Sequence, residues 1–336
     1  MNKIIPVLLL IILFSCKTSK QNTTSEAAPS TNVEKVDIEE YMDQASLYLK
    51  TKEYDKVIAN CFVVLKQDST YWRPYILAGI AYRNMNKFPK TICHFKKVLE
   101  LHPDDAAPYN NLATIYNELG YIDISLDLYS KALEIELVYA NAYNNRGNLY
   151  IDLQEYEKAM DDLEEAMLIN PSGGDSYYNM GIVFMKQERY ELAEEYLYEA
   201  VEIDPNFTES LLVLGDVFEK QNKEKEAKEL YEKLIPHLTQ NIEDNHYDYS
   251  SLLYRAETYT KQGKDELAQP DYQKANEMYN EIVEQNPDSW TMLNKRGRTF
   301  IGLKQYDKAR AYFNRSLLLF PKSDEAKRKL SEIEGK

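Results

Sequence analysis

The sequence lacks the residue patterns on which most catalytic and metal sites depend. It has no phosphate-cradling glycine loop, no nucleophile elbow and no His-Glu-x-x-His pair. None of its four histidines has metal-ligand spacing to another histidine or a cysteine: His94, His102, His237 and His246. Adjacent acids, such as Asp161 with Asp162 and Glu194 with Glu195, are expected on solvated helix faces. We therefore expect no enzymatic activity, no metal and no cofactor.

Positive charge is also scarce. The chain has 40 Lys and Arg against 55 Asp and Glu, a formal net charge of -15 at pH 7, and its basic residues are scattered. Binding to a nucleic-acid backbone needs a clustered basic surface. We therefore expect no nucleic-acid partner.

Long apolar runs are almost absent, and the one near the start is too short to span a membrane. It extends from Ile4 to Phe14, directly after Lys3, and as a helix it would measure about 16 Å. A hydrocarbon core is about 30 Å thick. The run is therefore interpreted as the apolar region of a signal peptide.

The segment Leu13-Phe14-Ser15-Cys16 closes this run and resembles the cleavage box of bacterial lipoproteins. The resemblance implies that residues 1–15 are removed, that the thiol of Cys16 is lipidated, and that the acyl chains hold the protein to a membrane. An ordinary signal peptide followed by an incidental cysteine remains the alternative.

Residues 16–37 are predicted to be the lipidated cysteine followed by a flexible tether, because large apolar side chains are few and periodicity is missing. A random coil of this length reaches roughly 25 Å. Lys17 follows the cysteine and Glu26 is the first acid. By the sorting pattern of lipoproteins, this implies an anchor in the bacterial outer membrane that faces the periplasm.

After residue 37 the sequence repeats itself every 34 residues. In each unit the eighth position is small, the eleventh is aromatic and the twentieth is small or β-branched, as in Gly147, Tyr150 and Ala159. This spacing predicts two helices per unit whose small residues allow close approach of the backbones. Six contiguous units are predicted at residues 38–71, 72–105, 106–139, 140–173, 174–207 and 208–241.

The remaining residues are less regular. We predict a spacer at 242–248, an irregular seventh unit at 249–289, an eighth unit at 290–323 and a capping helix within 324–336. In the seventh unit Ala275, rather than Ala268, is taken as the small position, which gives its second helix one additional heptad with Pro270 near the start.

The series Tyr143-Gly147-Tyr150-Ala159-Ala166-Pro171 strongly resembles the tetratricopeptide repeat family. The resemblance implies an all-α fold, an α-solenoid of tandem helical hairpins that forms a right-handed superhelix. It also implies that the protein binds protein or peptide partners.

Cys61 and Cys93 lie in consecutive second helices. Such helices are about 8–10 Å apart at their axes, and a disulfide needs Cα atoms within about 7 Å. We therefore expect two small buried thiols.

In tetratricopeptide arrays the first helices line the concave surface, and here they carry a series of asparagines. The residues concerned are Asn110, Asn111, Asn144, Asn145, Asn148 and Asn179. Asn111, Asn145 and Asn179 share position 6, so this amide recurs once per repeat. A carboxamide offers both donors and an acceptor, and the series resembles the asparagine ladder in the repeat region of O-linked N-acetylglucosamine transferase. We expect the amides to point into solvent and to hold a peptide backbone.

Basic residues flank the predicted groove, Arg73 and Arg83 on one side and Lys295 and Arg298 on the other. They are expected to orient acidic segments of a partner. A groove that is merely polar remains the alternative, because asparagine at position 6 is common in the family.

The sequence thus predicts a lipid-anchored protein–protein interaction scaffold that binds a partner in its concave groove. The alternative is a fixed structural or assembly subunit of a cell-envelope complex, of the kind that assembles pili or outer-membrane barrels.

Overall fold

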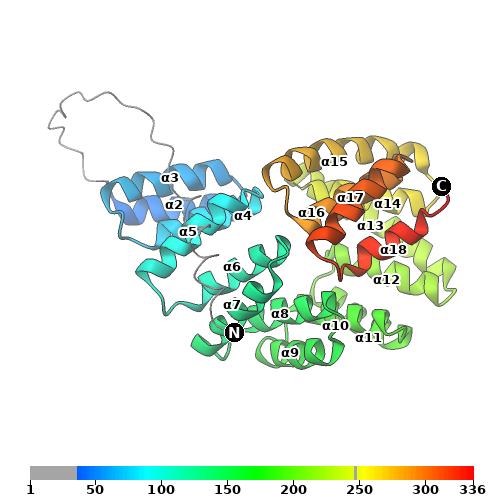
Figure 1. The fold of residues 1–336 in the computed structure, drawn as a ribbon, viewed down its shortest axis with the longest axis horizontal. Coiled ribbons are helices and arrows are strands. Elements are labelled where there is room, and N and C mark those ends of the chain that lie inside the picture. Colours follow the sequence, from blue (N-terminus) through cyan, green and yellow to red (C-terminus); the bar gives the residue numbers. More distant parts are fainter. Residues whose placement is uncertain (1–35, 246–247) are drawn as a thin grey trace. The chain divides into compact units, whose positions relative to one another are not determined.

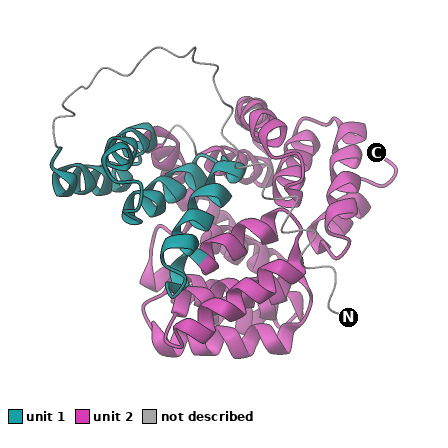
Figure 2. Cartoon of the chain, turned by 60° about the vertical axis from the view of Figure 1, so that its left-hand side comes forward, with its two compact units in different colours: residues 1–108 teal, residues 109–336 magenta. Residues whose placement is uncertain are grey.

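The structure is a computed structural model, and it describes residues 36–245 and 248–336. The predicted signal peptide, Cys16 and nearly all of the predicted tether lie outside the described residues. The chain divides into two compact units, Met1–Pro108 and Tyr109–Lys336 (Figure 2). No helix in the described ranges is long and apolar enough to cross a membrane.

The described residues of the first unit form two helical hairpins and the first residues of α6 (Figure 1). Ala45, Val57, Cys61 and Ala81 are fully buried between them. Small side chains at these positions allow the helix axes to approach closely. The helices are α2 (Ile38–Lys50), α3 (Tyr54–Gln67), α4 (Arg73–Asn84) and α5 (Phe88–Leu101).

The second unit continues the same pattern with α6, whose first residues belong to the first unit, and twelve further helices. They are α6 (Ala106–Glu118), α7 (Ile122–Ile135), α8 (Ala140–Asp152), α9 (Tyr156–Ile169), α10 (Gly174–Lys186), α11 (Tyr190–Ile203), α12 (Thr208–Lys220), α13 (Glu224–Asp244), α14 (Tyr249–Lys261), α15 (Asp265–Gln285), α16 (Trp290–Gly302), α17 (Tyr306–Leu319) and α18 (Asp324–Glu332).

The first helices begin at or next to the first residues of the predicted units. In five of the six contiguous units the first helix begins at the first predicted residue, and α4 begins one residue later, at Arg73. The small position also has the expected role: a Cβ added to Gly147 would lie 3.0 Å from the side chain of Leu163 on the paired helix. Ala159 is fully buried in the same hairpin. The described residues therefore form the all-α solenoid that the resemblance to tetratricopeptide repeats implies.

Each hairpin turn contains a residue with positive φ at position 15 of its repeat. Only Gly120 and Gly263 are glycines, for which this conformation carries no Cβ clash. In the other six turns a residue with a side chain adopts it, at a cost of about 1 kcal/mol each. These residues are Lys52, Asn86, Gln154, Glu188, Asn222 and Lys304.

The irregular region differs from the prediction in its boundaries. α13 continues to Asp244, so the first three residues of the predicted 242–248 spacer are helical. Both α13 and α15 have 21 residues, whereas α9 has 14. The additional heptad predicted for the seventh unit is therefore present, and the sixth unit has one as well.

The choice of Ala275 over Ala268 as the small position of the seventh unit is wrong. Arg255 pairs with Asp271, sixteen residues later, with the same spacing as Arg146 and Asp162 in the fourth unit. This spacing makes Ala268 the equivalent of Ala159. Both Ala268 and Ala275 are fully buried. The additional heptad of α15 gives this helix a second small buried position seven residues after the first.

Cys61 is a free cysteine. Cys61 is buried as expected, and burial raises the pKa of its thiol to about 12. Cys93 is only half-buried. The prediction of a small buried thiol is therefore confirmed for Cys61, and the predicted burial of Cys93 is only partial.

Candidate functional site

The last repeat of the second unit packs against its first repeats. Trp290, the first residue of α16, donates its indole N–H to the main-chain oxygen of Asn117 on α6, over 2.7 Å. Its ring lies in a buried apolar cluster with Ala113, Leu149 and Phe320. This contact joins residues 173 positions apart in the sequence, and no repeat-based pattern predicts it.

A row of amide–amide hydrogen bonds links consecutive first helices of this unit. Asn145 donates its Nδ2 to Oδ1 of Asn110 over 3.0 Å, and Asn179 donates its Nδ2 to Oδ1 of Asn144 over 2.9 Å. Each bond joins position 6 of one repeat to position 5 of the preceding one. We call these two bonds the amide ladder.

The expectation that the amides point into solvent is wrong for two members of the amide ladder. Asn110 and Asn179 are each only 6% exposed. Their burial is tolerated because the neighbouring amide satisfies part of their hydrogen-bonding capacity. Position 5 of the second repeat is Ile76, which has no acceptor, so the ladder begins with Asn110.

A cavity of about 470 Å³ lies along the amide ladder. Four of its lining residues were predicted from the sequence, and four were not. The lining residues are Asn144, Asn145, Asn148, Asp175, Tyr178, Asn179, Phe207 and Glu209. We call this the amide cavity.

The unpredicted half of the lining consists of two acids and two aromatic residues. The rings of Tyr178 and Phe207 pack with centroids 5.2 Å apart. Burial raises the pKa of the Glu209 carboxyl, and burial together with Asp204 raises that of Asp175. The signal for both acids was available in the sequence, because each occupies position 2 of its repeat, one of the groove positions.

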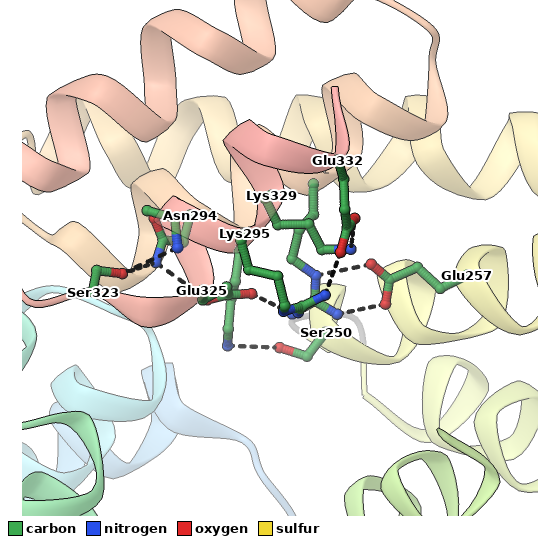
Figure 3. Close-up of polar contacts among 11 residues, drawn as sticks. Ser250, Glu257, Asn294, Lys295, Ser323, Glu325, Lys329 and Glu332 are labelled. Atoms are coloured by element: carbon green, nitrogen blue, oxygen red, sulfur yellow. Dashed lines mark hydrogen bonds and ion pairs between the residues drawn. The ribbon is translucent and has the colours of Figure 1, made fainter. Parts of the chain in front are cut away.

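Residues of α14, α16 and α18 form a second polar region of this unit, which is charged. We call it the charged part of the inner surface, and the region of the amide ladder its amide-lined part. Arg298 is 16% exposed, donates Nε to Glu257 over 2.8 Å and donates Nη1 to Glu325 over 3.3 Å. Burial alone would raise the pKa of Glu257, but the guanidinium of Arg298 lowers it below the usual range. Lys295 donates Nζ to Ser250 over 3.3 Å. Figure 3 shows this network, which Glu257 enters from α14 and Glu325 from α18.

Of the four cations expected to flank the groove, Arg298 differs from the expectation in its partners. Arg298 is neutralised by its own chain, so it is not free to orient an acidic partner. Arg73 belongs to the first unit, where it contacts the hydroxyl of Tyr71 at 3.1 Å and the carboxylate of Glu39 at 3.5 Å. Arg83 also belongs to the first unit, whereas the asparagines of the predicted groove belong to the second.

Asp152 is on α8, in the amide-lined part, and lies close to α18 of the charged part. Burial, and secondarily the carboxylate of Glu325, raises its pKa to about 7, with Asp324 adding to the shift and Lys186 opposing it. Lys186 of α10 forms an ion pair with Asp324 of α18. Helix α18 therefore brings two acids toward a carboxyl on α8.

A second cavity, of about 480 Å³, lies near the C-terminus. Its lining consists of side chains in the turn before α17 and its first residues, together with Lys336. It contains none of the residues that the repeat pattern places in the groove. Among the described residues, no group of three His, Cys, Asp or Glu side chains forms a metal site.

Comparison with protein families gives matches to models of the tetratricopeptide repeat. They cover residues 94–123, 140–172, 174–207, 208–235 and 260–325, together more than half of the chain. No curated protein matches the chain by sequence.

Several solved structures resemble the fold. Human IFIT1, in a dimer with PPP-AAAA, matches with a TM-score of 0.58 at 17% identity, over 84% of this chain and 73% of that one. A tetratricopeptide repeat protein from Parabacteroides merdae matches with a TM-score of 0.45 at 20% identity, over 77% and 97% of the two chains. At such identities the likeness concerns the fold.

Proposed function

Because the chain belongs to the tetratricopeptide repeat family, we propose that it is a protein-interaction scaffold whose amide cavity holds an extended segment of a partner protein. We further propose that Cys16 carries a lipid anchor. The anchor would place the scaffold at the bacterial outer membrane, facing the periplasm. The protein would act by binding and would catalyse no reaction.

The observation that carries this proposal is the cavity along the amide ladder. The ladder uses Nδ2 of Asn179 and Oδ1 of Asn144, so Oδ1 of Asn179 and Nδ2 of Asn144 remain for a ligand. Held amides lose little conformational freedom on binding. They can therefore accept from and donate to a peptide backbone whatever its side chains are.

The charge of the cavity supports a protein partner over a nucleic acid. Its lining residues include Asp175 and Glu209 and no basic side chain. A phosphate backbone would meet two carboxylates there, which is unfavourable. The PPP-AAAA of the IFIT1 structure therefore does not transfer to this cavity.

The binding experiment is a pull-down from envelope extracts with the full-length, membrane-anchored chain, followed by mass spectrometry and titration of the captured partner. Replacing Asn145 and Asn179 together by Ala should weaken binding about 30-fold, because each amide contributes about 1 kcal/mol. Asn314→Ala, on the exposed face of α17, is the control. Equal affinity of the double variant and the control would overturn the proposal.

The anchor has a separate test. Changing Cys16 to Ser should abolish incorporation of labelled fatty acid and leave the chain in the soluble fraction. Incorporation equal to that of the unchanged protein would overturn the anchor proposal without affecting the binding proposal.

A second candidate function, a fixed subunit of an envelope complex, is favoured by exposed apolar residues outside the cavity. Leu137, Val138 and Leu168 are 72%, 70% and 76% exposed. Apolar side chains in such positions become buried when a permanent neighbour covers them. In that case crosslinking in cells should give one stoichiometric partner that is retained when Asn145 and Asn179 are replaced.

A further inference from the structure

We infer that the amide cavity recognises a basic side chain, arginine or lysine, in the partner segment that it holds. This inference rests on the proposed peptide-binding function and adds the chemical class of the residue that is recognised. Three features of the lining point to a cationic group.

The first feature is the direction of the ladder hydrogen bonds. Asn145 and Asn179 both donate their Nδ2 groups to the neighbouring repeat. Two of the four lining amides therefore present an acceptor, Oδ1, to the cavity. With the carboxylates of Asp175 and Glu209, acceptors predominate in the lining. A guanidinium or an ammonium group brings only donors and so matches such a lining.

The second feature is that the cavity carboxylates lack the counter-charge that the buried acids of this unit, Asp162 and Asp271, have. Asp162 and Asp271 each accept two hydrogen bonds of 2.7 to 2.8 Å from an arginine of the same repeat. Within the described part of the chain, no basic side chain forms an ion pair with Asp175 or Glu209. Partial burial without an ion-pair partner raises the pKa of the half-buried Glu209 carboxyl, and partial desolvation together with the neighbouring acid Asp204 raises that of Asp175.

Lys295 is the basic residue whose field reaches Glu209. It lowers the pKa of Glu209 but does not offset the effect of burial. Its Nζ is bonded to Ser250 on the charged part of the inner surface. An incoming cation would thus supply the counter-charge that the chain itself does not bring to the cavity.

The third feature is the ring pair. Tyr178 and Phe207 line the same cavity as the two acids. A cation that sits against an aromatic ring while it contacts a carboxylate gains from both interactions. The net charge of -15 additionally favours the approach of a basic segment.

The test uses a library of displayed heptapeptides selected on the full-length chain in detergent. Three proteins are compared: the unchanged chain, Asp175→Asn with Glu209→Gln, and Asp161→Asn with Glu195→Gln. The last is a matched control, because it removes the same charge from exposed faces of second helices. Binders are then titrated, each beside a copy in which citrulline, a neutral isostere, replaces the enriched arginine.

We expect the unchanged chain and the control to enrich peptides containing Arg or Lys, and the cavity variant to lose this preference. Citrulline should weaken binding about tenfold or more to the unchanged chain and have little effect with the cavity variant. Enriched peptides without basic residues, whose binding is lost in the Asn145→Ala and Asn179→Ala double variant, would overturn the inference and leave the proposed function standing. Failure to enrich any peptide that depends on these asparagines would overturn both.

Discussion

The two parts of the inner surface of the second unit use polar residues in different ways. On α6, α8 and α10 the amides are bonded to one another, and the cavity lies beside them. On α14, α16 and α18 an arginine is held between two glutamates from different helices. In the amide ladder each carboxamide uses either its Nδ2 or its Oδ1, so the other atom remains available. In the charged part the arginine and the glutamates neutralise one another. Polar residues at a concave surface therefore do not by themselves mark a binding site. They can bind a partner only if they keep donors or acceptors that the chain itself does not use.

The largest expected effect comes from breaking the charged part. Arg298→Ala should lower the free energy of unfolding of the second unit by about 3–5 kcal/mol, because it leaves Glu257 and Glu325 without their counter-charge. Unfolding is followed by fluorescence in a Trp72→Phe background. Trp290 is then the only tryptophan of the chain and reports on the second unit.

Lys158→Ala provides the control for that experiment. The ion pair of Lys158 with Glu155 is exposed, so its loss should leave the free energy of unfolding nearly unchanged. If the two substitutions destabilise the second unit equally, the charged part does not have the structural role assigned to it.

Asp152, which lies between the amide-lined part and the charged part, should make the stability of the second unit depend on pH. The pKa of Asp152 is raised to about 7, so between about pH 4 and pH 7 the folded state keeps a proton that the unfolded state has released. The free energy of unfolding therefore falls as pH rises through this window. Asp152→Asn should remove this loss and stabilise the second unit by up to about 4 kcal/mol at pH 8, with little effect at pH 4.

Denaturant titrations at several pH values, again with Trp290 as the reporter, measure this dependence. Asp161→Asn, which removes an exposed carboxyl, should leave the pH profile unchanged. An unaltered profile for Asp152→Asn would show that the folded chain does not raise the pKa of Asp152.

The contact between the first and last repeats of the unit is tested by a glycine pair. Gly120 and Gly263 both have positive φ, so an alanine is strained at either position. A Cβ at Gly120 would also lie 3.0 Å from the main-chain oxygen of Leu319, whereas one at Gly263 meets nothing within 4 Å. Gly120→Ala should therefore cost about 1 kcal/mol more than Gly263→Ala. Equal melting temperatures would argue against this contact.

The smallest effect is expected for the amide ladder. Asn179→Ala removes one hydrogen bond, to Asn144, and should lower stability by about 1 kcal/mol. Asn148→Ala removes an exposed amide of the same cavity and should leave stability unchanged. A loss of stability with Asn148→Ala equal to that with Asn179→Ala would contradict the ladder.

The repeat period predicted the fold closely, because each hairpin is specified by local spacing. The small residue at position 8 and the aromatic residue at position 11 set the register of every unit. The left-handed turn was missed at the positions occupied by residues such as Lys52 and Glu188, since no glycine marks it. The end of α13 was missed because Ile242 to Asp244 continue a helix that the 34-residue period would have closed.

The candidate site was predicted in part. The asparagines of the fourth and fifth repeats were found from their recurrence, which depends on sequence alone. Their pairing was not, because it depends on which position 5 residue faces which position 6 residue across two repeats. The internal partners of Arg298 were also beyond the sequence, since Glu257 and Glu325 lie 41 and 27 residues away in the chain.

Site-specific photocrosslinking in cells tests most directly the claim that the partner binds at the amide cavity. One protein carries a benzoylphenylalanine at Asn148, an exposed residue of the cavity lining, and a second carries it at Leu168, an exposed apolar residue of α9. We expect position 148 to capture a partner, and we expect this crosslink to disappear when Asp175 and Glu209 are neutralised. Position 168 should capture none. A partner captured from position 168 alone would contradict it and favour the fixed envelope subunit.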